Sequence, residues 1–70
     1  MKLSARNQFK GTVASITEGA VNAIVIIDIG GGHKMTSTIS MGAVKELGLK
    51  VGSPAYAVVK ATSVMVGVDG

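Results

Sequence analysis

Apolar residues fall into short runs of strand length along most of this 70-residue chain. Residues 9–17, 22–29 and 33–39 are rich in β-branched or alternating side chains. Breaks at Glu18-Gly19 and Gly30-Gly31-Gly32 separate them, and such glycine-containing breaks are typical of turns. The pattern predicts three strands joined by tight turns. If the first strand is regular, Phe9 and Val13 lie on one face and Ile16 on the other.

The strand at residues 22–29 is apolar on both faces through its middle. Ala23, Val25 and Ile27 alternate with Ile24 and Ile26. A strand with one face in water normally alternates apolar with polar residues, and in so small a protein only one face can point into the core. We therefore expect Ile24 and Ile26 to pack against another subunit. The alternative is that they are exposed apolar side chains without a partner, which are common on protein surfaces.

The period of the pattern changes at Ser40. Ser40 is a typical helix N-cap, Met41, Val44 and Leu47 follow at helical spacing, and Gly48 is a typical stop. These features predict a short helix. After a turn before Pro54, residues 55–60 and 64–68 read as two more strands around a short connection.

The predicted order is three strands, one short helix and two strands, in a single domain spanning residues 1–70. It is all-β with one short helix, and it is the outline of a five-stranded, OB-like Greek-key barrel. A chain this short has little core, and small domains usually need disulfides, a metal or a partner subunit. There is no Cys, and His33 is the only His. We therefore expect a homo-oligomer.

The composition argues against several classes of function. The absence of Cys is compatible with a reducing cytoplasm, and no apolar run suggests a signal peptide or a membrane span. OB-type nucleic-acid binding relies on stacking aromatics, and the chain has only Phe9 and Tyr56. His33 has no evident acid or nucleophile partner, and the four carboxylates form no metal-ligand pattern. We expect a cytoplasmic protein that is not an enzyme and has no metal-cation site, cofactor, nucleic-acid partner or membrane.

Hydrogen-bond donors without a nearby carboxylate gather at three places in the sequence. Residues 4–8 combine a hydroxyl, a guanidinium and two amide side chains, and the helix start after Ser40 offers free backbone amides. Lys60 is followed by the hydroxyls of Thr62 and Ser63. Taken singly, Ser40 is explained by N-capping and Lys60 by an ordinary charge at a strand end. Taken together, the three places suggest a small-anion site.

Three segments in the same order resemble the molbindin (Mop) family of molybdate-binding proteins. They are SARNQ at residues 4–8, TSTIS at 36–40 leading to ELG at 46–48, and KATSV at 60–64. The resemblance covers essentially the whole chain. It implies a small β-barrel that assembles as a hexamer, arranged as a trimer of dimers, with oxyanions bound between subunits.

The resemblance also implies the site residues. Ser4, Ala5, Arg6, Lys60 and Ala61 would come from one subunit, and Ser40 with the helix start would come from its neighbour. Relatives often carry a Ser where this chain has Ala43, so either the affinity is lower or the Ala43 amide carries the contact. The implied function is binding of molybdate or tungstate for intracellular storage. The alternatives are a molybdate-sensing regulatory or interaction module and, from the fold alone, an OB-type nucleic-acid-binding protein.

Overall fold

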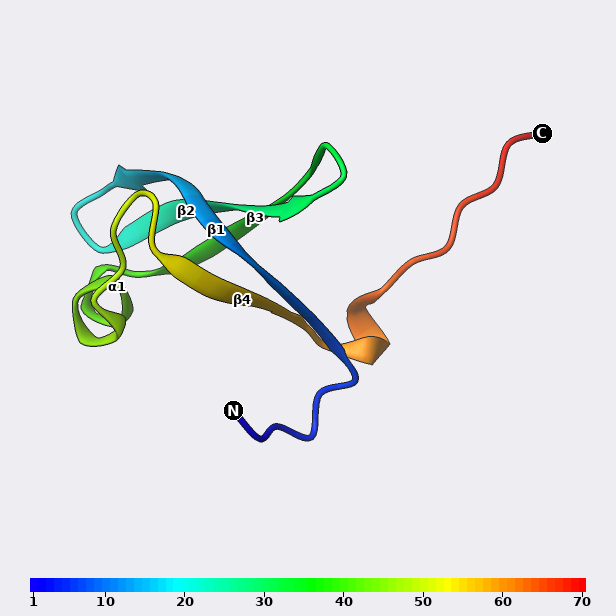
Figure 1. Ribbon diagram of the computed structural model, residues 1–70, viewed down its shortest axis with the longest axis horizontal. Coiled ribbons are helices and arrows are strands. Elements are labelled where there is room, and N and C mark those ends of the chain that lie inside the picture. The colour runs from blue at the N-terminus through cyan, green and yellow to red at the C-terminus, as the bar shows by residue number, and fades with distance from the viewer.

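The computed structural model describes all 70 residues, and its four strands form one antiparallel sheet in the order β3-β2-β1-β4. The elements are β1 (Asn7–Glu18), β2 (Asn22–Gly30), β3 (His33–Ser40), α1 (Met41–Leu47), β4 (Pro54–Val59) and a 3₁₀ turn, η1 (Ala61–Ser63). Figure 1 shows that the sheet curls, that α1 lies near one end of it, and that the C-terminal segment leads away from it. The seven residues of α1 make the longest helix, too short to cross a membrane.

The prediction of five strands was wrong in one respect. The first four strands and the helix form as expected, but residues 64–68 are in no strand or helix. Within this single chain they have no neighbouring strand to pair with, and the Val64 amide bonds only back to the Ala61 carbonyl, at 3.3 Å. The fold is therefore mostly β with one short helix, and its sheet has four strands.

A β-bulge in β1 changes which side chains of this strand face the core. The pairing with β2 shifts between Val13 and Ser15, so that Val13 lies opposite Ile27 while Ile16 lies opposite Val25. Both side chains consequently point to the inner face, and Ile16 packs against the core. The expectation that Ile16 faces away from Val13 was wrong because the bulge at Ala14 reverses the alternation.

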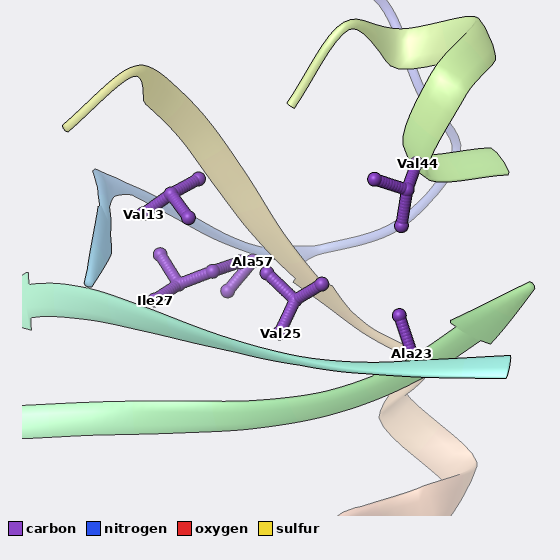
Figure 2. Close-up of a cluster of buried hydrophobic side chains, with 6 residues drawn as sticks. All are labelled: Val13, Ala23, Val25, Ile27, Val44 and Ala57. Carbon is purple, nitrogen blue, oxygen red and sulfur yellow. The ribbon is translucent and has the colours of Figure 1, made fainter. Parts of the chain in front are cut away.

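The core is small and lies inside the curl of the sheet. Six side chains are buried, from β1, β2, α1 and β4: Val13, Ala23, Val25, Ile27, Val44 and Ala57. Figure 2 shows Val44 pointing from α1 toward the β2 side chains. On the outer face of β2, Ile24 stays 45% exposed and Ile26 is half-buried. A single chain thus covers only one face of β2.

Local sequence signals explain the two ends of α1. Ser40 is extended, with φ −70° and ψ 153°, and its hydroxyl accepts a hydrogen bond from the Ala43 amide at 3.0 Å. Gly48 ends the helix in the left-handed region, at φ 62°, where a residue without a side chain is favoured. The predicted helix and both of its caps are confirmed.

Candidate anion site

A pocket of about 380 Å³ lies where the N-terminal segment meets the end of β4. Its lining residues are Ser4, Ala5, Arg6, Val58, Lys60, Ala61 and Thr62. The pairing of the sheet explains this meeting, because β1 and β4 run antiparallel and Asn7 lies opposite Val59. Residues just before β1 and just after β4 must therefore emerge at the same end of the sheet. Five of the seven predicted site residues meet in this pocket.

Gln8 holds the N-terminal wall of the pocket in place. Its side-chain amide nitrogen, Nε2, donates a hydrogen bond of 2.7 Å to the Ala5 carbonyl. This bond closes a turn directly before β1, which presents Ser4, Ala5 and Arg6 to the pocket. Within the polar cluster at residues 4–8, Gln8 therefore positions the donors and does not itself line the pocket.

The opposite wall is formed by Lys60 and the turn η1. Lys60 is extended, and the amides of Ser63 and Val64 close the turn by bonding to the carbonyls of Lys60 and Ala61, at 2.9 and 3.3 Å. The turn places Thr62 on the pocket beside Lys60. The sequence had indicated a hydroxyl on this connection but had not assigned Thr62 to the site.

Every polar side chain that lines the pocket can donate a hydrogen bond. Arg6 and Lys60 bring two positive charges, Ser4 and Thr62 bring hydroxyls, and no carboxylate is among the lining residues. The hydrogen bonds made by side chains elsewhere in the structure use neither cation. Such a donor set suits a small anion that carries no proton of its own.

The pocket is open to water in a single chain. Ser4, Arg6, Lys60 and Thr62 are all exposed. Charges in contact with water interact weakly, and their attraction for an anion grows when a neighbouring surface excludes the solvent. The residues present therefore form part of a site that a second surface could complete.

Ser40 and Ala43 lie away from this pocket. Ser40 ends β3 and pairs with Asn22, next to the β1–β2 connection, whereas the pocket lies at the Asn7 end of β1. The length of β1 separates the two places by up to about 36 Å, at ~3.3 Å per residue. Within this chain these two residues do not line the pocket.

Some hydrogen-bond donors at the start of α1 already have partners within the chain. The Ala43 amide donates to the Ser40 hydroxyl, and the Met41 amide donates to the Val21 carbonyl at 2.8 Å. The Ser40 oxygen acts as acceptor in its capping bond, so its own proton remains available to a ligand. The Met41 and Ala43 amides are therefore already engaged, while the Ser40 hydroxyl keeps its proton for a ligand.

His33 and a second hollow lie outside this pocket. No three His, Cys, Asp or Glu side chains lie close enough together to hold a metal ion. His33 lies exposed at the β2–β3 turn. The second hollow, between β3, α1 and β4, has no charged lining residue and is unsuited to an anion.

Comparison with known proteins relates nearly the whole chain to one family. Residues 3–66 match the family model described as the TOBE domain. The probable molybdenum-pterin-binding protein of Haemophilus influenzae is 68% identical over 69 residues, which cover 99% of this chain and 100% of that protein.

Solved structures agree with the fold. MopII from Clostridium pasteurianum, in an apo form, superposes with a TM-score of 0.90 at 49% identity, covering 96% of this chain and 100% of that one. The cytoplasmic molybdate-binding protein ModG, with molybdate bound, gives a TM-score of 0.93 at 51% identity, covering 99% of this chain. This chain spans 49% of the ModG chain.

Proposed function

Because the chain belongs to the TOBE-domain family, among the molybdenum-pterin-binding (Mop) proteins, we propose that it binds molybdate or tungstate as a store of the oxyanion. One observation carries the proposal. Ser4, Ala5, Arg6, Lys60 and Ala61 line a single pocket in which every polar side chain is a donor. The relatives that bind molybdate by name, ModG among them, support the choice of ligand.

The donor set matches the chemistry of molybdate. At neutral pH molybdate is a tetrahedral dianion that accepts hydrogen bonds and has no proton to donate. Hydroxyl, ammonium and guanidinium donors satisfy it fully. Phosphate is partly protonated near pH 7, and only the hydroxyls of Ser4 and Thr62 among these side chains could accept its proton, so the site suits phosphate less well. Sulfate and tungstate meet the same requirement, and the size of the cavity then favours the larger molybdate and tungstate over sulfate.

In this proposal the complete site lies between subunits of a homohexamer, a trimer of dimers. A neighbour supplies the Ser40 hydroxyl and the start of its α1, which the same chain cannot bring to the pocket. The exposed outer face of β2, with Ile24 and Ile26, supports an interface with another subunit. Covering the pocket would lower the local dielectric and strengthen the attraction of Arg6 and Lys60 for the anion.

The proposed role is binding without catalysis, in the cytoplasm, with no part for nucleic acid or a membrane. The pocket pairs no general base with a nucleophile, since its charged lining residues are Arg6 and Lys60. The description of the related ModG as cytoplasmic supports the location. A role in sensing would use the same pocket, and the number of anions bound per subunit separates it from storage.

Isothermal titration calorimetry at pH 7 and constant ionic strength tests the proposal. We expect binding heats with molybdate and tungstate, and weaker binding of sulfate and phosphate. A stoichiometry near or above one anion per subunit favours storage. If molybdate and tungstate give no heat at concentrations where sulfate is also silent, the proposed function is wrong.

A further inference from the structure

Val58 is the one residue of the anion pocket that lies within a strand. The other lining residues come from the segment before β1 or from the stretch after β4, since β1 begins at Asn7 and β4 ends at Val59. Figure 1 shows these two segments meeting at one end of the sheet, with η1 directly after β4. The sheet therefore fixes the place of Val58 more firmly than the turns fix the places of the donors.

Val58 gives the pocket an apolar part beside its donors. Its side chain is 45% exposed in the single chain, so its methyl groups are accessible to a ligand. Together with the methyl groups of Ala5 and Ala61 it makes up the lining side chains that cannot donate a hydrogen bond. Gln8 is paired with Val58 across the sheet, so the two side chains lie next to each other on one face. The bond from Gln8 to the Ala5 carbonyl, at 2.7 Å, ties this apolar part to the N-terminal wall.

A hydrocarbon wall disfavours strongly hydrated anions more than weakly hydrated ones. When an oxyanion oxygen leaves water for a surface that offers no hydrogen bond, the lost hydration is not replaced. Sulfate carries the same two charges as molybdate on a smaller ion, so it binds water more tightly and loses more at such a wall. The donors attract both anions, because both are tetrahedral, doubly charged and free of protons at neutral pH. Discrimination between the two anions therefore depends on the apolar part of the lining.

We propose that Val58 determines the specificity of the pocket for large, weakly hydrated tetrahedral dianions over sulfate. Its side chain removes water from the anion and offers no hydrogen bond in exchange. The preference thus arises from a disadvantage imposed on sulfate, in addition to the contacts that every such anion makes with the donors. This role rests on the proposed function, because it concerns the selectivity of the same pocket.

Selenate provides a graded probe of this specificity. It is fully ionised at neutral pH, and it lies between sulfate and molybdate in size and in strength of hydration. We expect its affinity to lie between those of sulfate and molybdate. Selenate that binds as tightly as molybdate, or more weakly than sulfate, would contradict a preference based on hydration.

Val58→Thr tests the residue itself, because threonine has nearly the shape of valine and replaces one methyl group with a hydroxyl. Threonine also favours strands, so β4 should form as before. The new hydroxyl can donate to the anion, and sulfate should regain more affinity than molybdate. Titration calorimetry at pH 7 gives both dissociation constants, and we expect the ratio of the sulfate constant to the molybdate constant to fall by about 10-fold. An unchanged ratio would overturn the proposal.

Two further variants serve as controls. Val51→Thr makes the same change at a side chain that is 67% exposed and lines neither hollow, so the ratio should stay as in the unchanged chain. Thr62→Val makes the reverse change within the pocket, so the ratio should rise. An equal fall in Val51→Thr and Val58→Thr would also overturn the proposal.

The ratio separates this proposal from the proposed function. Both constants are measured on one preparation, so an effect of Val58→Thr on folding or assembly that weakens both anions equally cancels in the ratio. An unchanged chain that binds neither molybdate nor sulfate would show that the proposed function is wrong. An unchanged chain that prefers molybdate, with the same preference in Val58→Thr, would show that only the role of Val58 is wrong.

Discussion

The two cations of the pocket are held in place to different degrees. Lys60 sits between β4 and η1, so its backbone is fixed on both sides, and the Ser63 amide bonds to its carbonyl at 2.9 Å. Arg6 lies on a segment that is tied down by the hydrogen bond from Gln8 to Ala5. The compact ammonium of Lys60, on a fixed backbone, suits a small tetrahedral anion. The longer guanidinium of Arg6 could equally stabilise an interface between subunits. Lys60 is therefore the more direct probe of the site.

We expect Lys60→Met to weaken molybdate binding by ~1.5–3 kcal/mol, or about 10- to 150-fold, because it removes one charge-assisted hydrogen bond. The assembly should stay intact, since Lys60 is exposed and makes no side-chain hydrogen bond within the chain. Calorimetry on Lys60→Met and on Lys50→Met, which loses the same charge outside the pocket, checks this. Equal affinities in the two variants would mean that the pocket is misplaced.

The sequence predicted the donors of the site better than their arrangement. Donors without a nearby acid are visible in a sequence, and Ser4, Arg6 and Lys60 do line one pocket. The sequence analysis did not assign Thr62 to the site and did not predict the hydrogen bond from Gln8 to Ala5. Both depend on how a turn is closed by hydrogen bonds, which the spacing of residues does not reveal. The assignment of Ser40 and Ala43 to a neighbour stays a prediction, although their distance from the pocket agrees with it.

Elements that are specified by neighbouring residues in the sequence formed as predicted. Features that depend on pairing with another strand did not. The α1 helix has its cap at Ser40 and its stop at Gly48, so its bounds follow from adjacent residues. The bulge in β1 arises from the pairing with β2, which the sequence of β1 alone does not report. Residues 64–68 have strand composition, yet a strand exists only when another strand pairs with it.

Close approach of β1 and β2 requires a glycine at position 11. A β-carbon there would collide with the Asp28 carbonyl oxygen and would lie 3.0 Å from the Ile27 Cγ2. We expect Gly11→Ala to lower the free energy of unfolding by ~1–3 kcal/mol, as is usual when an added group is forced into a packed region. Urea denaturation at a fixed protein concentration measures it.

Gly42→Ala is the matched control for this substitution. At Gly42 the added carbon would meet only the Ser40 hydroxyl, at 3.7 Å, which is an ordinary contact. Alanine also favours the helix, so this variant should be unchanged or up to about 1 kcal/mol more stable. If both variants lost stability equally, the close contact at Gly11 would not be the cause.

The core of the whole molecule is small. Six buried side chains close one face of the sheet. The anion pocket, the apolar hollow between β3, α1 and β4, the outer face of β2 and residues 64–68 all remain open. Each open surface is one that a second subunit or an anion could cover. Folding, assembly and ligand binding should therefore be linked, because anything that binds only the folded form stabilises it by mass action.

This linkage predicts how the melting temperature responds to concentration. At molybdate concentrations of about 100 times the dissociation constant, one site contributes ~2.7 kcal/mol, and ~1 kcal/mol moves the melting temperature of a domain this size by about 4–8 °C. We expect a rise of roughly 10–20 °C with molybdate, and a further rise with protein concentration. Differential scanning calorimetry measures both.

Two variants separate the effect of molybdate binding on the melting temperature from the effect of assembly. Lys60→Met should lose most of the molybdate shift but keep the dependence on protein concentration, because only the pocket is changed. Ile24→Lys should lose the dependence on protein concentration, because it places a charge on the outer face of β2, which is the proposed interface between subunits. If the pocket is completed by the neighbour's Ser40, Ile24→Lys should also lose much of the molybdate shift. A full molybdate shift in a monomeric Ile24→Lys chain would show that one subunit binds the anion alone and that the site does not need the interface.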